Sequence, residues 1–152
     1  MNELRDIVRL LEIAFSPNKY ESCLVHALHR ANREIVEKTV YKDDRLIAYS
    51  AFSKAYRQGA HIGWHLAPVA VAPGHQRQGL GTNIIVDGLK DPRIHGTPIF
   101  VLGPPSYYAR FGFQVSPSIY CPFDPSGQHF LSLNWNSRER FQIDYEHEFK
   151  EA

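Results

Sequence analysis

Apolar residues recur at two different spacings, and the change between them divides the chain into helices and strands. Near the N-terminus, Leu4, Ile7 and Leu11 follow a helical spacing, which predicts an amphipathic helix over residues 3–15. The same spacing resumes after a Ser-Pro-Asn turn and predicts a second helix at about 20–32. Two helices are therefore expected before any strand.

The spacing then changes to two, which is typical of strands. Residues 35–42 and 46–56 are rich in β-branched and aromatic residues, and the Asp43-Asp44-Arg45 turn between them predicts a hairpin. A third strand is expected at about 61–71. Residues 99–102 are all apolar, which is typical of a strand buried on both faces.

A helical pattern over about 79–90, ended by Asp91-Pro92, separates the third strand from the apolar one. A strand, a helix and another strand in this order predict two parallel neighbours in one sheet. The fold class is therefore α+β, with a mixed, mostly antiparallel sheet, a central parallel strand pair and flanking helices. The remaining expected elements are a short helix at 104–111, strands near 112–120 and 128–135, and a weak alternation over 140–146.

Composition and charge narrow the class of protein. The 152 residues are 43% hydrophobic and 22% charged, which suits one globular domain spanning 1–152. The 17 basic and 16 acidic residues nearly cancel, so no basic field would draw the chain to nucleic acid or an anionic membrane. Apolar runs are far shorter than a membrane span. Cys23 and Cys121 form no CxxC pair and the N-terminus has no signal pattern, so a soluble, cytoplasmic protein is expected.

The segment from His65 to Leu89 carries the most specific chemistry. Its strand contains Pro68, and a central strand tolerates proline only at a bulge, because proline cannot donate to the ladder. A bulge would separate this strand from its parallel neighbour at 99–102. The gap would lie beyond the carboxyl ends of two parallel strands, where open sheets tend to bind ligands.

Glycines follow the bulged strand and lead directly into the helix. In the run Gln76-Arg77-Gln78-Gly79-Leu80-Gly81 they would let the backbone approach a ligand, and the free N–H groups of a helix N-terminus favour a phosphate. A Walker loop does not fit, because Thr82 and Asn83 follow the last glycine. A dinucleotide fingerprint does not fit either, because Ile84 stands where it needs a third glycine. A glycine-rich turn that binds nothing is the plainer alternative.

Two runs of residues together resemble the GNAT superfamily of N-acetyltransferases. Gln76, Gly79 and Gly81 match its Gln/Arg-x-x-Gly-x-Gly/Ala motif after a strand. The run from Gly103 to Phe113 contains Tyr-Tyr-Ala-Arg-Phe-Gly-Phe and resembles the YhbS-like bacterial branch, and the tail from Phe141 to Phe149 is similar to the end of that branch. One departure is that the superfamily usually begins with a strand, whereas this chain begins almost directly with a helix.

The resemblance implies a fold, a co-substrate and an activity. It implies a GNAT-like sheet with a splayed central strand pair, in which an acetyl group passes directly from acetyl-coenzyme A to an amine in a ternary complex. The bulged strand would pair with the pantetheine arm like an added strand, and the amides of the turn would hold the pyrophosphate. The coenzyme-binding residues implied are Val69, Ala70, Val71, Gln76, Arg77, Gln78, Gly79, Leu80, Gly81 and Thr82.

The resemblance also assigns two side chains to the chemistry. Tyr108 matches the family tyrosine that protonates the departing thiolate, and a phenol with a reference pKa of about 10 is protonated at neutral pH. His65 precedes the bulge, where some relatives carry a histidine, and is a candidate base for deprotonating the amine. The plainer alternatives are a packed aromatic side chain, as expected for Tyr107, and a water relay in place of the histidine.

Metal and thiol chemistry fit less well. His61 and His65 would stand about 13 Å apart along a strand, too far for one ion, and His26 and His29 have no evident third ligand. We therefore expect no metal. An acyl-carrying Cys121 lacks an evident histidine partner, so a plain thiol is favoured.

A small amine or a peptide is the expected acceptor. Its pocket is expected between residues 15–20 and the loop 121–128, in which Asp124 is the only carboxylate. A homodimer stays open, because family members often pair. The alternatives to an enzyme are a non-catalytic acyl-coenzyme A sensor, which the intact Tyr108 disfavours, and an unrelated phosphate-binding module.

Overall fold

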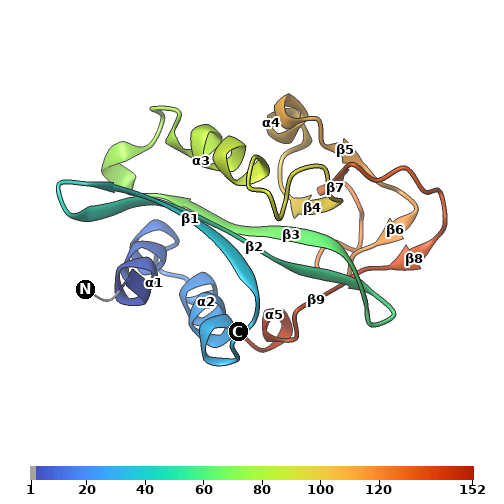
Figure 1. The fold of residues 1–152 in the computed structure, drawn as a ribbon, viewed down its shortest axis with the longest axis horizontal. Helices are drawn as coiled ribbons and strands as arrows, with labels where there is room; N and C mark the ends of the chain where they lie inside the picture. The colour runs from blue at the N-terminus through green and yellow to red at the C-terminus, as the bar shows by residue number, and fades with distance from the viewer. Residues whose placement is uncertain (1–2) are drawn as a thin grey trace.

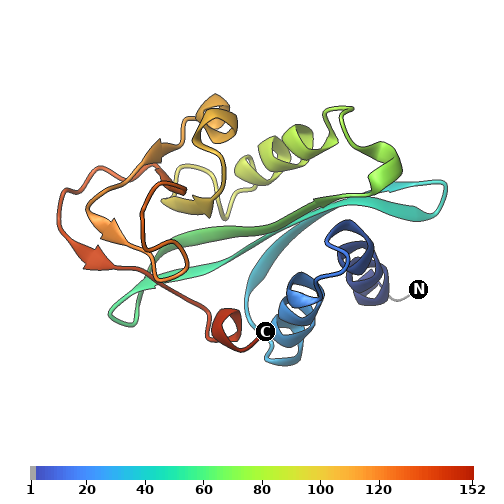
Figure 2. The same ribbon diagram turned by 180° about the vertical axis from the view of Figure 1, so that it is seen from behind.

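The computed structural model describes residues 3–152, and its long strands form a twisted sheet with helices on both faces (Figures 1 and 2). The helices are α1 (Glu3–Ala14), α2 (Tyr20–Arg30), α3 (Leu80–Leu89), α4 (Pro105–Tyr108) and α5 (Glu148–Glu151), with 3₁₀ turns at Pro73–His75 and Ala109–Phe111. The strands are β1 (Ile35–Lys42), β2 (Arg45–Arg57), β3 (Ala60–Val71), β4 (Ile99–Leu102), β5 (Gln114–Val115), β6 (Ile119–Tyr120), β7 (Phe130–Leu133), β8 (Phe141–Gln142) and β9 (Asp144–Tyr145).

The main sheet has the predicted mixed topology. Its strands lie in the order β1-β2-β3-β4-β7-β5, and β9 also pairs with β2. The central neighbours β3 and β4 are parallel, and the other pairs of this sheet are antiparallel. The predicted fold class is therefore confirmed, including the strand-helix-strand unit formed by β3, α3 and β4.

The β1–β2 hairpin turns over two residues. Asp43 and Asp44 have positive φ angles of 51° and 63°, and β2 begins directly at Arg45. Two central residues with positive φ give the tight turn that matches the twist of paired strands. The turn is thus one residue shorter than the sequence predicted.

The helices divide between the two faces of the sheet. Figure 1 shows α3 and α4 on one face, and α1, α2 and α5 on the other. Neighbouring β2 residues point to opposite faces, so Phe52 packs in the same cluster as Ile84 of α3, whereas Ala51 packs in the same cluster as Leu11 of α1. Helix α1 begins at Glu3 and matches the helix predicted over residues 3–15.

The segment 112–120 was predicted as one strand, and this prediction was wrong. It contains two short strands, because Ser116-Pro117 interrupts the ladder and proline has no N–H to donate. β5 joins the main sheet beside β7, whereas β6 pairs with β8 in a separate two-stranded sheet. The short C-terminal helix α5 was not anticipated. Nowhere in residues 3–152 is a helix long and apolar enough to cross a membrane.

Candidate active site

A bulge interrupts β3 at the predicted proline. Ser50 of β2 pairs with Val69, but Phe52 pairs with Leu66, so the two β3 residues Ala67 and Pro68 stand opposite the single β2 residue between those pairs. An extra residue bends the bulged strand and increases its twist. The predicted bulge is therefore confirmed.

The bulge opens the sheet between β3 and β4. The two strands pair only through Trp64 with Ile99 and His65 with Phe100. At this closed end the N–H of Trp64 also donates to the carbonyl of Pro98, with N and O 2.9 Å apart. Beyond His65 the described strands no longer pair, so one edge of β3 is open along the stretch that ends at Val71.

A cavity of about 480 Å³ lies at this opening. Its walls come from β3, β4, α4, the α1–α2 region, the loop after β6 and the C-terminal tail. The lining residues are Phe15, Tyr20, Glu21, Leu24, His65, Leu66, Ala67, Pro68, Val69, Leu102, Tyr108, Phe123, Tyr145 and Phe149. The cavity thus joins the two segments between which the acceptor pocket was expected, and we call it the acceptor cavity.

The turn before α3 presents backbone amides to a second hollow. Gly79 precedes the helix with a φ of +83°, which glycine adopts without strain, and no side chain caps the helix. The first intrahelical bond joins the N–H of Asn83 to the carbonyl of Gly79 at 2.9 Å. The amides of Leu80, Gly81 and Thr82 have no acceptor within the helix, so they are available to an anion.

This amide cradle is shaped by its surroundings. A hollow of about 360 Å³ lies over it, lined by residues 75–77 and 79–82 together with Val71 and Tyr107. The side-chain amide of Gln76 donates to the carbonyl of Val71 at 3.1 Å, which ties the turn to the end of β3. The cradle therefore continues directly from the open edge of β3.

Tyr107 links the cradle to α4. Its hydroxyl and that of Thr82 lie 2.9 Å apart in a hydrogen bond, and the guanidinium carbon of Arg110 lies 4.3 Å from its ring centroid. Its ring also packs edge-on against Tyr108. Tyr107 is thus a packed aromatic side chain, as the sequence predicted, and it holds α4 against the start of α3.

Tyr108 lies at the wall of the acceptor cavity and is 9% exposed. Its ring packs against those of Phe111 and Phe113. Burial, with a smaller contribution from neighbouring Tyr107, raises the pKa of Tyr108 to about 12. The phenol therefore keeps its proton throughout the physiological pH range and is available there as a donor.

Gly103 makes room for the Tyr108 ring. A Cβ atom at position 103 would overlap the ring edge of Tyr108, so the Gly103→Ala variant must displace this ring. We expect the variant to lose roughly 1–3 kcal/mol of unfolding free energy, as overpacked positions do. Urea unfolding measures the loss, and Gly74→Ala is the matched control because its Cβ would meet nothing within 4 Å. Equal midpoints for the two variants would contradict the expectation.

His65 lines the same cavity but is deeply buried. Its ring stacks on Tyr145 with the ring centroids 3.6 Å apart, and it packs beside Phe149. Burial lowers the pKa of His65 to about 3, so the ring is neutral at physiological pH. A base with so low a pKa accepts protons poorly, and the base role of His65 stays a prediction that its burial disfavours.

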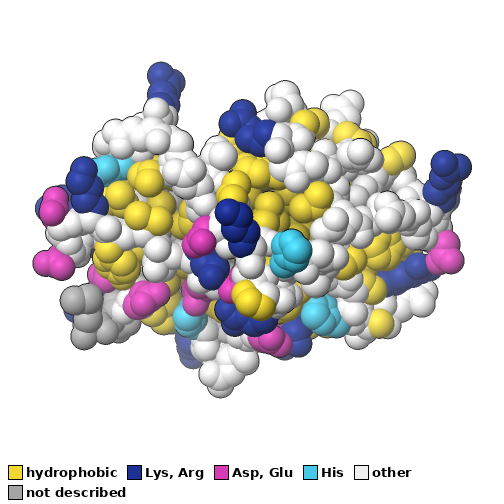
Figure 3. All heavy atoms as spheres, turned by 45° about the horizontal axis from the view of Figure 1, so that its top comes forward, with side chains coloured by type: hydrophobic (Ala, Val, Ile, Leu, Met, Phe, Trp, Pro, Cys, Tyr) yellow, Lys and Arg dark blue, Asp and Glu magenta, His cyan; other side chains and the backbone are white. Residues whose placement is uncertain are grey.

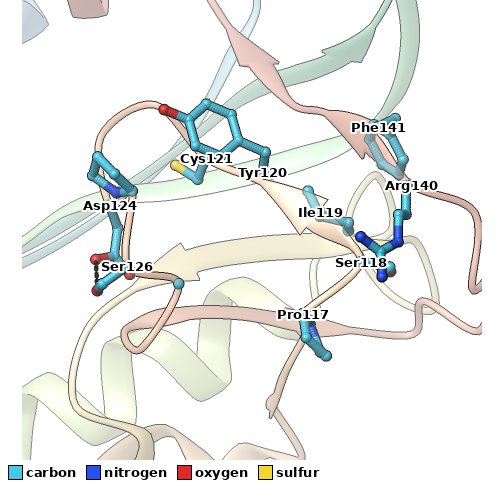
Figure 4. Close-up of a pocket in the computed structure, with 11 residues that line it drawn as sticks. Pro117, Ser118, Ile119, Tyr120, Cys121, Asp124, Ser126, Arg140 and Phe141 are labelled. Atoms are coloured by element: carbon cyan, nitrogen blue, oxygen red, sulfur yellow. Dashed lines mark hydrogen bonds between the residues drawn. The ribbon is translucent and has the colours of Figure 1, made fainter.

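A further cavity, of about 520 Å³, lies between β6, β8 and the loop after β6 (Figure 4). Cys121 and Asp124 line it. Asp124 is committed to its own loop, because it accepts hydrogen bonds from the Ser126 hydroxyl and the backbone N–H of His129. Cys121 is buried, and burial raises the pKa of its thiol, which disfavours a nucleophilic thiolate. Sγ of Cys121 lies 3.6 Å from the Tyr145 hydroxyl, so these two side chains help to separate this cavity from the acceptor cavity.

The surface carries no concentrated charge over the face seen in Figure 3. Basic side chains are scattered there, and hydrophobic side chains gather near its middle. Within residues 3–152, no three His, Cys, Asp or Glu side chains are grouped so that they could hold a metal ion. An anion bound on this side would depend on local geometry such as the amide cradle.

Several residues of the acceptor cavity were not predicted from the sequence, among them Glu21, Tyr145 and Phe149. Glu21 belongs to an amphipathic helix, in which a glutamate is ordinarily solvated. The two aromatic residues lie in the tail, more than a hundred positions away along the chain. The hydroxyl of Tyr20 donates to the carbonyl of Phe149 at 2.7 Å, a contact between chain ends that no local pattern indicates.

Residues 3–97 match the sequence model of the Acetyltransferase (GNAT) family. The chain belongs to the GNAT family. It is 35% identical over 128 residues to the uncharacterized N-acetyltransferase YhbS of Escherichia coli strain K12, a match that covers 81% of this chain and 70% of YhbS. The predicted family resemblance, including its YhbS-like branch, is therefore confirmed.

Solved structures of GNAT proteins share the whole architecture. E. coli YhbS in complex with CoA superposes with a TM-score of 0.87 at 25% identity, covering 97% of this chain and 86% of that one. A GNAT family acetyltransferase from Brucella melitensis, in complex with acetyl-CoA, superposes with a TM-score of 0.80 at 27% identity, covering 97% and 92%. Both relatives bind the coenzyme that the open strand edge and the amide cradle would suit.

Proposed function

We propose that the protein is an N-acetyltransferase that transfers an acetyl group from acetyl-CoA directly to an amine. The observation that carries the proposal is the open edge of β3 running into the amide cradle, in a chain of the GNAT family. The open edge of β3 suits an amide-bearing arm, and the amide cradle suits a diphosphate. Coenzyme A carries both groups in one molecule.

The chain offers a contact for each part of acetyl-CoA. Backbone groups of Val69, Ala70 and Val71 pair with the pantetheine arm as an added strand would. The amides from Gln76 to Thr82 hold the pyrophosphate, with Arg77 as an additional charge. The thioester then lies at the acceptor cavity, because Val69 and Tyr108 both line that cavity.

Tyr108 acts as the general acid. The amine nitrogen attacks the thioester carbonyl carbon, a backbone N–H of the bulged strand stabilises the developing oxyanion, and the carbon–sulfur bond breaks. Tyr108 donates its proton to the departing thiolate, the attacking nitrogen releases one proton to solvent, and the Tyr108 phenolate takes up one proton from solvent, so the products are an amide and free coenzyme A. The buried position of Tyr108 keeps the phenol protonated for this step.

We also propose that residues 1–152 form a single acetyltransferase domain in the cytoplasm. Both cysteines are free, which suits a reducing compartment.

Two measurements test the proposal. Calorimetry should show tighter binding of acetyl-CoA than of ADP, because ADP lacks the pantetheine arm. Thiol release from acetyl-CoA, followed across a panel of small amines and peptides, should rise above the rate without acceptor. Equal binding of the two nucleotides would instead support a phosphate-binding module. Tight acetyl-CoA binding without transfer to any amine would support a non-catalytic sensor.

A further inference from the structure

The acceptor cavity has an apolar, largely aromatic wall. Five of its lining residues are Phe15, Tyr20, Phe123, Tyr145 and Phe149, contributed by three separate segments of the chain. Aromatic side chains offer a large contact area to an apolar group and also attract cations to their faces. The cavity is therefore suited to a compact apolar molecule that carries a positive charge.

The hydroxyl groups in this wall are already engaged. Tyr20 donates to the Phe149 carbonyl at 2.7 Å, and the Tyr145 hydroxyl lies 3.6 Å from Sγ of Cys121. Their hydrogen bonds fix the rings and leave little capacity for polar groups of a ligand. The polar recognition of an acceptor must then come from other lining residues.

Two lining residues carry polar atoms that the protein leaves unsatisfied. Oε1 of Glu21 and Nδ1 of His65 are buried and make no hydrogen bond within residues 3–152. A buried polar atom without a partner destabilises the fold, so a ligand that brought hydrogen-bond donors to either of these residues would be favoured. A carboxylate oxygen only accepts, and the ring nitrogen of a neutral histidine accepts when the other nitrogen carries the proton.

An ammonium group matches these two acceptors. It supplies three N–H donors and has no lone pair that needs a donor. Glu21 is also the only carboxylate among the described residues that line the cavity. No lysine or arginine of the described residues lines the cavity, so a carboxylate or phosphate on the acceptor would be buried without a counter-charge.

We propose that the acceptor is a primary monoamine with an apolar body and no acidic group, and that Glu21 binds its ammonium group, which releases one proton to solvent before the neutral amine attacks the thioester. This inference rests on the acetyltransferase function proposed above and names the substrate class of the same cavity. An α-amino acid is disfavoured because of its carboxylate. A polyamine is disfavoured because the cavity offers one carboxylate for several charges.

Matched amines test the substrate class through thiol release from acetyl-CoA. We expect kcat/KM for 2-phenylethylamine to exceed that for L-phenylalanine by at least about 30-fold, because the two differ only in a carboxylate whose burial is costly. L-phenylalaninamide keeps the size of that group without its charge and should recover much of the loss. Putrescine should be a poor acceptor.

The Glu21→Gln variant tests whether Glu21 binds the ammonium group of the acceptor. Loss of a charged hydrogen bond should raise KM for 2-phenylethylamine about 10- to 100-fold and leave KM for acetyl-CoA unchanged. Glu12→Gln is the matched control, because Glu12 is exposed on α1 and does not line the acceptor cavity. An unaltered melting temperature shows that both variants are folded.

Several results would overturn the inference. Equal or better transfer to L-phenylalanine, an unchanged KM in the Glu21→Gln variant, or transfer to a peptide amine and to none of the small amines would each contradict it. Those three results would leave the acetyltransferase function standing. Binding of acetyl-CoA without transfer to any amine would overturn the function and, with it, the inference.

Discussion

Replacing Tyr108 with phenylalanine is expected to lower the rate of acetyl transfer by roughly 100-fold or more, the usual contribution of a general acid. The ring and its packing against Phe111 and Phe113 stay, so the substitution removes only the proton donor. Single-turnover measurements with saturating acetyl-CoA and amine isolate the chemical step. Affinity for acetyl-CoA should change little.

The pH dependence gives a second readout of the same variant. Because the pKa of Tyr108 is about 12, the native enzyme should keep its donor protonated, and the rate should not fall up to about pH 10. The loss in the Tyr108→Phe variant should be similar across this range. Tyr120→Phe is the matched control, since Tyr120 is exposed on β6 and lies outside the acceptor cavity. An unchanged chemical step in Tyr108→Phe at every pH would refute the acid role.

Replacing Gly81 with valine is expected to weaken acetyl-CoA binding by about 100-fold or more, because two or more charged hydrogen bonds of about 1.5–3 kcal/mol each would be lost. A Cβ at this position would lie 3.7 Å from a Val71 methyl and 3.9 Å from the Tyr107 hydroxyl, which are ordinary contacts. The free protein should therefore accommodate the Cβ, while the two γ-methyl groups of valine occupy the space that a diphosphate needs.

Calorimetry with two ligands separates this effect from misfolding. Acetyl-pantetheine lacks the pyrophosphate, so its weaker binding should be nearly the same in the Gly81→Val and native proteins. Gly74→Val is the control, because Gly74 lies outside the cradle and has open space around it. Native-like affinity of Gly81→Val for acetyl-CoA would show that the diphosphate binds elsewhere.

The features of the site that could be predicted from the sequence are those determined by neighbouring residues in the chain. Pro68 cannot donate to a ladder, and the bulge forms at that residue. Gly79 lies where the chain needs a positive φ before a helix, so the turn into α3 is also readable from nearby residues. The parallel pairing of β3 and β4 followed from the order of three adjacent elements.

The acceptor cavity was less predictable, because distant segments build it. Its approximate position followed from the family resemblance, but Tyr145 and Phe149 reach it only because the tail packs back against α2 and β2. Glu21 lies in the first turn of α2, where a glutamate ordinarily needs no special explanation. The division of segment 112–120 depended in turn on which sheets its two halves joined.

If acetyl-CoA pairs with the open edge of β3 as proposed, the bound co-substrate extends the sheet as an added strand would. A ligand that binds only the folded chain adds stability with concentration, about 2.7 kcal/mol at one hundred times its Kd. The protein's resistance to unfolding would then follow the cell's supply of activated acetate. A low concentration of acetyl-CoA would then reduce both the rate of acetyl transfer and the lifetime of the folded protein.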